Sequence, residues 1–168
     1  MVEKARRAKS QNNERLHRVR GIANYQFNSQ VGHKIFPDTC KVEVSKRTGR
    51  LRRVLLASKV LATIRATDGR IVLTIWGAKC LHAAVKYPRL RVVVHQEVAH
   101  FIAEGRSLFA KHVEEVDPQL RAGDEVLVVD SKDELLAVGV AQLSPQEMLE
   151  LTRGVAVKTR HSIDKRKT

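Results

Sequence analysis

Apolar positions recur at steps of three and four near the start of the chain, beginning around Asn13. They are Leu16, Val19, Ala23 and Phe27. This spacing gives one apolar face on a helix, and Gly32 and Pro37 end the pattern. Residues 1–12 are polar and basic and carry no such stripe, so we expect them to form a flexible basic arm.

After Pro37 the pattern changes to an alternation of apolar and polar residues, which is typical of strands with one covered face. Four short segments follow it: residues 41–45, 52–56, 59–66 and 70–75. Thr48-Gly49 and Asp68-Gly69 have the composition of hairpin turns. Residues 76–87 lack alternation and are predicted to form a helix. Residues 13–88 are therefore expected to be a small α/β meander domain.

A second unit is expected over residues 89–164. Its predicted strands are residues 90–95, 107–113, 125–130, 134–142 and 155–161. Residues 97–104 have helical spacing, and Gly105 is placed to end that helix as a C-cap. Ser144-Pro-Gln-Glu147 has the pattern of a helix start, with a capping serine and a glutamate three positions later. The chain is thus predicted to be α+β, with a barrel-like β unit second and a basic tail over residues 165–168.

The chain of 168 residues has a formal net charge of +13. Residues 1–59 carry fifteen Lys and Arg against four Asp and Glu, whereas residues 111–154 carry four against ten. Segregated positive charge is typical of proteins that bind polyanions, because Lys and Arg release the counterions condensed on phosphates. Charge therefore favours a nucleic-acid partner. Membrane binding is not expected, since no basic helix carries an apolar face with Trp or Phe.

Several other classes of protein are excluded. The length is too short for a catalytic barrel of about 250 residues, and no apolar run approaches the ~20 residues that span a bilayer. Cys40 and Cys80 form neither a disulfide framework nor a CxxC motif, which is typical of a reduced cytoplasmic protein. His95 and His100 lie five positions apart and would point about 140° away from each other on a helix, so we expect no metal site there. No GxGxxG or GxxxxGKS/T motif occurs, so we expect no other cofactor.

Seven aromatic residues are few for the base-stacking platforms of RRM or OB-fold proteins. The residues expected in the core instead are Trp76, Phe101, Phe109 and Val113. The acidic pairs Glu114-Glu115 and Asp133-Glu134 are expected in solvated turns rather than in a catalytic site.

One ordered set of motifs in the second unit is specific. It consists of Gly105-Arg106-Ser107-Leu-Phe-Ala-Lys111-His112-Val113, Gly123-Asp124-Glu125-Val126, Leu136-Ala-Val-Gly139-Val-Ala141 and Gly154-Val-Ala-Val-Lys158. With this order and spacing, residues from about 90 to 164 resemble a PUA domain, the pseudo-β-barrel named after pseudouridine synthases and archaeosine transglycosylases. Another small β-barrel of translation proteins is the alternative. The resemblance implies a PUA-type pseudo-β-barrel that binds RNA.

The first unit carries a second resemblance. Its motifs are Arg20-Gly-Ile-Ala-Asn24-Tyr25-Gln26-Phe27, Ile35-Phe36-Pro37 and Lys46-Arg-Thr48-Gly49-Arg50. They resemble the segment just ahead of the PUA domain in archaeal tRNA-guanine (archaeosine) transglycosylases. From Arg15 onward the chain is therefore similar to the C-terminal part of such an enzyme, without the catalytic barrel, its acidic nucleophile and its zinc site.

The resemblance also implies where RNA would bind. Gly105 would let a phosphate or sugar approach the backbone closely. One wall of the groove would consist of Arg106, Ser107 and Lys111, and the other, if the two strands are neighbours, of Lys158, Arg160 and His161. The cations would bind phosphates, and Ser107 would read a 2′-hydroxyl.

These expectations favour a non-catalytic, cytoplasmic RNA-binding protein that binds tRNA as an accessory to RNA modification, with a separate catalytic subunit as a further partner. Two alternatives stay open. The first is an enzyme, either a subunit of a tRNA-modifying transglycosylase or a nuclease. The second is a protein-interaction module of ribosome assembly or translation, in which the acidic stretch 111–154 docks a basic partner.

Overall fold

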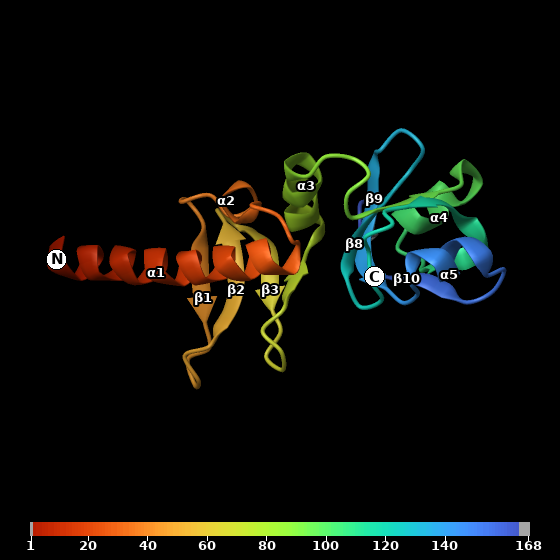
Figure 1. The fold of residues 1–168 in the computed structure, drawn as a ribbon. Helices are drawn as coiled ribbons and strands as arrows, with labels where there is room; N and C mark the ends of the chain where they lie inside the picture. Colours follow the sequence, from red (N-terminus) through yellow and green to blue (C-terminus); the bar gives the residue numbers. More distant parts are fainter. Residues whose placement is uncertain (1, 165–168) are drawn as a thin grey trace. The chain divides into compact units, whose positions relative to one another are not determined.

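A computed structural model of the chain describes residues 2–164 (Figure 1). The chain divides into two compact units, residues 1–84 and residues 85–168, which we call unit 1 and unit 2. The predicted basic tail, residues 165–168, lies outside the described residues. Within the described part, the chain has the predicted α+β composition, with helices and mostly antiparallel strands.

Unit 1 contains a four-stranded antiparallel sheet in the order β1-β2-β3-β4, the predicted meander. Its strands are β1 (Lys41–Val44), β2 (Leu51–Leu56), β3 (Lys59–Ile64) and β4 (Ile71–Leu73). Gly49 and Gly69, in the predicted hairpin turns, have φ angles of +68° and +72°. Such left-handed backbone favours glycine, which explains how the sequence sets these turns.

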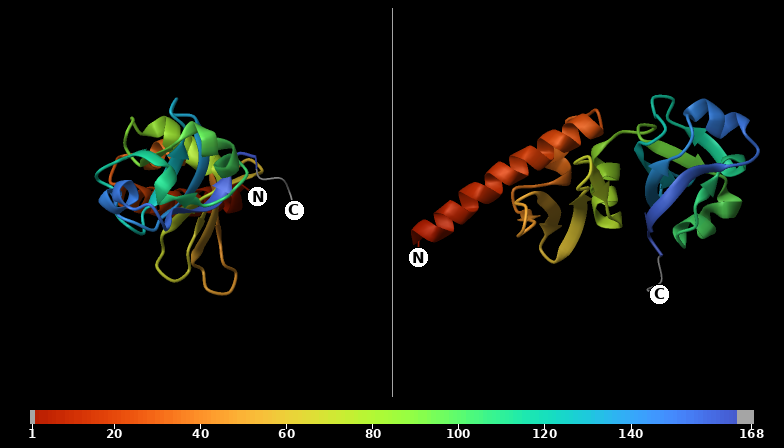
Figure 2. Two further views of the ribbon diagram at one scale, coloured as in Figure 1. Left: turned by 90° about the vertical axis from the view of Figure 1, so that its right-hand side faces the viewer. Right: turned by 90° about the horizontal axis from the view of Figure 1, so that it is seen from below.

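Helix α1 (Val2–Gln26) packs on this sheet through the predicted apolar stripe. Leu16, Val19, Ala23 and Phe27 are each at most 1% exposed. The helix begins well before the expected start at Asn13, so residues 2–12, predicted as a flexible arm, are helical here. Ala, Arg, Lys and Gln are common in this segment and are good helix formers, so the helix that is anchored from Asn12 onward continues toward the N-terminus. Figure 2 shows this part of α1 projecting past the sheet of unit 1.

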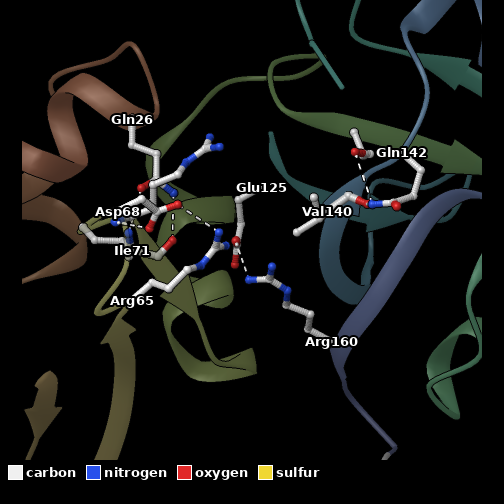
Figure 3. A network of polar contacts seen from close by, with 10 residues as sticks. Gln26, Arg65, Asp68, Ile71, Glu125, Val140, Gln142 and Arg160 are labelled. Carbon is white, nitrogen blue, oxygen red and sulfur yellow. Dashed lines mark hydrogen bonds and ion pairs between the residues drawn. The ribbon is translucent and has the colours of Figure 1, made fainter. Parts of the chain in front are cut away.

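Two side-chain amides of α1 close the edges of the sheet. Asn12 donates to the carbonyl of Cys40 and accepts from the amide of Val42, at edge strand β1. In edge strand β4, Gln26 donates to the carbonyl of Ile71 and accepts from its amide, each at 2.8 Å (Figure 3). The two amides lie fourteen positions apart, which is about 21 Å of helix, against about 14 Å across four strands. The helix therefore crosses the whole sheet.

Two short helices complete unit 1. They are α2 (Gly32–Ile35) and α3 (Ile75–Ala84). Arg20 of α1 is buried, and it donates to the carbonyl of Phe36, directly after α2, and to the carboxylate of Asp38. Trp76, expected in the core, is instead 41% exposed, with the Lys59 ammonium 3.6 Å from its ring centroid. It lies in the first turn of α3, on the side away from buried Gly77 and Ala78.

Unit 2 contains a six-stranded sheet in the order β6-β10-β9-β8-β5-β7. Its strands are β5 (Arg91–Val94), β6 (Leu108–Phe109), β7 (Val113–Val116), β8 (Glu125–Val129), β9 (Leu135–Ala141) and β10 (Val155–Ser162). The edge strands β6 and β7 are joined by the three-residue 3-10 turn η2 (Ala110–His112). Three residues span at most about 10 Å, whereas six flat strands would separate the edges by about 24 Å. The sheet must therefore curl into a nearly closed barrel.

The prediction of one continuous strand over residues 107–113 was wrong, because η2 interrupts it. The acidic pair Glu114-Glu115 lies on strand β7 rather than in a turn. Asp133, of the second pair, does occupy a turn, but its carboxylate pairs with the buried Arg91 at 3.1 Å. That carboxylate therefore neutralises a buried guanidinium, which the sequence pattern did not reveal.

The helical segments of unit 2 are η1 (Gln96–Val98), α4 (Ala99–Ala103) and α5 (Pro145–Glu150). The first two replace the single predicted helix over residues 97–104. The capping box predicted for α5 is confirmed: the Ser144 hydroxyl accepts from the Glu147 amide, and the Glu147 carboxylate accepts from the Ser144 amide at 2.8 Å. Among residues 2–164, no helix combines the length and apolar character needed to cross a membrane.

Candidate RNA interface

The predicted site begins where helix α4 ends at Gly105. The amide of Gly105 donates to the carbonyl of Ile102, and the amide of Arg106 donates to that of Phe101. These two bonds form a Schellman motif, and Gly105 has the left-handed φ of +103° that this cap requires. The motif also places the Arg106 guanidinium 4.8 Å from the Phe101 ring centroid. The predicted C-cap is therefore confirmed, and it positions a cation over an aromatic face.

Beside this cap lies a hollow of about 350 Å³ on unit 2. Its lining residues come from α4, the cap, β6 and η2, and they are Val98, Phe101, Ile102, Arg106, Ser107, Leu108, Phe109, Lys111 and His112. Three of the seven predicted site residues, Arg106, Ser107 and Lys111, thus line one hollow. Arg106 and Lys111 are exposed, and Ser107 is half-buried.

Two aromatic side chains of this hollow were expected in the core, and that expectation was wrong. Phe101 is 37% exposed and Phe109 48% exposed, whereas Val113 is buried as expected. Phe109 follows the fully buried Leu108 in β6, so it points to the opposite side of the strand. Because residues 107–113 were predicted as one continuous strand, Phe109 was assigned to the same face as buried Val113. In the structure η2 separates the two residues, so they do not share a face. The hollow therefore combines apolar ring faces with cations.

The predicted second wall lies on β10, which pairs with β6 as the resemblance implied. The Thr159 hydroxyl donates to the carbonyl of Arg106 at 2.9 Å, so the final strand is bonded directly to the cap. Lys158, one residue before, is exposed and shares its register position with Val140 of β9. Because neighbouring residues of a strand point to opposite faces, the Lys158 side chain leaves the sheet on the face opposite Thr159.

Arg160 is held by a buried carboxylate. Its guanidinium lies 3.5 Å from Glu125, whose side chain is 4% exposed (Figure 3). Glu125 lies opposite Val140, on the same face as Lys158. Arg160 sits at a bulge of β10 between Thr159 and His161, and His161 is half-buried. The three predicted residues of this wall thus all lie within β10, and Arg160 among them balances the buried charge of Glu125.

The charge of the chain is divided unevenly between the units. Unit 1 holds eighteen Lys and Arg against five Asp and Glu, so its net charge is +13. Unit 2 holds thirteen of each and is neutral overall. The cations of the hollow are therefore local features of a neutral unit, while the excess positive charge lies on unit 1.

The described residues offer no centre for metal chemistry. Between positions 2 and 164, no group of three or more His, Cys, Asp or Glu side chains is placed to hold an ion. His95 precedes η1, and His100 lies against Phe101 with ring centroids 3.7 Å apart. Burial raises the pKa of the Cys40 thiol to about 11, so at neutral pH this sulfur is protonated and a weak nucleophile.

Comparison with known proteins identifies the class of both units. Residues 90–163 match the PUA domain, and residues 17–88 match the patch-forming domain C2 of tRNA-guanine transglycosylase. The six-stranded curled sheet is thus a PUA-type pseudo-β-barrel, as the sequence motifs implied.

Relatives that match most of this chain extend this result. The chain is 44% identical over 145 residues to the tRNA-guanine(15) transglycosylase of Methanothermobacter thermautotrophicus, covering 86% of this chain and 22% of that protein. It is 49% identical to the enzyme of Pyrococcus abyssi, covering 86% of this chain and 24% of that protein. The chain therefore corresponds to the C-terminal part of these archaeal enzymes and spans about a quarter of their length, without their catalytic domain.

Solved structures show the same fold. A hypothetical protein of Pyrococcus horikoshii superposes with a TM-score of 0.69 at 24% identity, over 89% of this chain and 90% of that one. A conserved PUA domain protein of Thermoplasma acidophilum superposes with a TM-score of 0.58 at 22% identity, over 87% of this chain and 91% of that one. The arrangement of a small α/β unit before a PUA domain thus also occurs in chains of similar length.

Proposed function

We propose that the chain is a non-catalytic RNA-binding protein that binds tRNA through its PUA domain and acts as an accessory to RNA modification. A separate catalytic subunit supplies the reaction. The observation that carries the proposal is the hollow beside Gly105, where two exposed cations and two exposed rings surround a hydroxyl. The names of the relatives, which are tRNA-guanine(15) transglycosylases, support tRNA as the RNA and modification as the process.

Each component of the hollow matches a chemical feature of RNA. Arg106 and Lys111 bind phosphates, and the backbone at Gly105 allows close approach because it carries no side chain. Phe109 offers a face on which an unpaired base stacks, and Ser107 accepts or donates to a 2′-hydroxyl. Lys158 and His161 extend the surface along β10. Arg160 contributes less, because Glu125 already neutralises it.

The decisive test is a double charge reversal, Arg106→Glu with Lys158→Glu, in the full chain. The matched control reverses two exposed cations elsewhere on unit 2, Arg121→Glu with Lys132→Glu. Fluorescence anisotropy with a tRNA transcript at several salt concentrations gives both affinity and salt slope. We expect the first variant to lose binding and the control to retain most of it. Equal affinities for both variants would reject this surface.

Two further measurements test the finer parts of the proposal. Crosslinking in cells, followed by sequencing of the bound RNA, separates tRNA from ribosomal RNA, and we expect tRNA to dominate. The purified chain, incubated with tRNA and labelled guanine, is expected to incorporate no label. Incorporation without an added subunit would contradict the non-catalytic role.

A further inference from the structure

We infer that unit 1 carries a second RNA site, a groove that binds unstacked nucleotides beside helix α1. This inference rests on the proposed RNA-binding function and assigns a part of it to the other unit. The groove lies between α1 and the loops at one end of the sheet, and its volume is about 360 Å³. Its lining residues are Arg18, Ile22, Arg50, Leu51, Ile64, Arg65, Ala66, Thr67 and Gly69.

The first argument is charge. The groove contains three arginines and no acidic lining residue, on a unit with a net charge of +13. Arg18 is exposed and, among the residues that the structure describes, has no hydrogen bond or ion pair. The Arg50 guanidinium makes one long contact, 3.5 Å to the carbonyl of Ala66. Arg65 differs, because Asp68 accepts from it at 2.9 Å (Figure 3). Arg18 and Arg50 are therefore available for phosphates.

The second argument is the apolar floor. Ile22, Leu51 and Ile64 are half-buried at the base of the groove. A double helix presents phosphates and hydroxyls at its surface, whereas an unpaired strand also presents the apolar faces of its bases. A groove with cations at its rim and aliphatic side chains at its base is therefore complementary to single-stranded RNA. Its volume lies at the lower end of the ~300–1,000 Å³ typical of ligand sites.

The third argument is the face of α1 that leads into the groove. Tyr25 is 90% exposed, and its spacing of three from Ile22 and seven from Arg18 places all three on one side of the helix. Arg7, eleven positions before Arg18, falls on the same side and is exposed. The two arginines lie about 16 Å apart along the axis. This face offers phosphate contacts upstream of the groove and a stacking ring at its end.

The test uses the full chain and two probes of equal length, a single-stranded oligouridine and an RNA hairpin. The charge variant is Arg18→Ala with Arg50→Ala. Its control, Lys34→Ala with Lys41→Ala, removes the same charge from exposed positions outside the groove. The stacking variant is Tyr25→Ala, which removes a ring with almost no contacts. Circular dichroism confirms that each variant remains folded.

We expect the charge variant to bind the oligouridine at least tenfold more weakly than the control, with a salt slope reduced by about 1.4, since each lost phosphate contact on a single strand contributes about 0.7. We expect Tyr25→Ala to weaken oligouridine binding about fivefold or more and to leave the hairpin unaffected. An equal loss for both probes would overturn the assignment to unstacked nucleotides.

The two proposals fail in different ways. Wild-type chain that binds neither probe nor tRNA would reject the proposed function itself. Wild-type binding that Arg106→Glu with Lys158→Glu abolishes, but that the unit 1 charge variant reduces no more than its control, would overturn the second site and leave the first intact.

Discussion

Units 1 and 2 are of equal length but differ in charge and in how their sheets end. Unit 1 carries the whole net charge of +13, and helix α1 closes its open sheet with one amide at each edge. Unit 2 is neutral, and its sheet closes by curling until β6 and β7 are three residues apart. The proposals therefore assign direct RNA contacts to both units, to the hollow of unit 2 and to the groove of unit 1, and assign the long-range attraction of RNA to the excess positive charge of unit 1.

The largest effects should come from glycines that face backbone in each unit. A Cβ at Gly77 would lie 2.2 Å from the carbonyl oxygen of Leu61, and one at Gly139 would lie 2.4 Å from that of Lys158. We expect Gly77→Ala and Gly139→Ala each to lower the free energy of unfolding by about 3 kcal/mol, because the backbones must separate. Hydrogen exchange should show Gly77→Ala deprotecting α3 and β3 and Gly139→Ala deprotecting β9 and β10. Equal deprotection of both units by either variant would contradict the division.

The different reliability of sequence reasoning in the two units has a physical basis. In unit 1, alternation and the glycine turns determine a meander of neighbouring strands, so the order β1 to β4 was predictable. In unit 2, β5 pairs with β8 in parallel and with β7 in antiparallel fashion, and no local pattern encodes those distant pairings. The PUA resemblance implied the pseudo-β-barrel, but these two pairings of β5 came from the structure.

Errors at the site have equally local causes. The turn η2 contains no glycine or proline, so nothing marked the end of β6, and Phe109 was assigned to the core. The role of Arg160 depends on Glu125, thirty-five positions away, a contact that spacing cannot reveal. Residues 2–12 lacked an apolar stripe and so were expected to be an arm, although their helix propensity is good. The Gly105 cap, in contrast, followed from a single local signal.

The next largest effect tests how unit 1 closes its sheet. Gln26→Ala removes both hydrogen bonds to Ile71 and leaves that edge of β4 without its partner. We expect a loss of about 1–2 kcal/mol in unfolding free energy, measured by urea denaturation. Gln26→Glu is the informative control, since its carboxylate still accepts from the Ile71 amide but cannot donate to the carbonyl. A loss as large as that of Gln26→Ala would show that the donated bond is the important one, and no loss in either variant would contradict the closure by α1.

A smaller effect of opposite sign is expected on the exposed side of α1. Gly21 lies in the helix interior, and an added Cβ would meet nothing within 4 Å. Alanine there should raise the unfolding free energy by about 0.5–1 kcal/mol, because glycine loses more backbone entropy in a helix. The melting temperature measures this. Destabilisation would mean that the segment around Gly21 is not helical in solution.

The smallest effect concerns the α5 cap of unit 2. Hydrogen bonds from the Ser144 amide and hydroxyl hold the pKa of Glu147 below its ordinary value of 4.5. A carboxyl with a lowered folded-state pKa contributes stability above its ordinary pKa and loses it as pH falls through the folded value. Glutamine can also complete a capping box, so Glu147→Gln should lower the melting temperature slightly at pH 7 and leave it equal to wild type at about pH 2–3. A difference that persists unchanged at the lower pH would show that the charge of Glu147 is not what stabilises the cap.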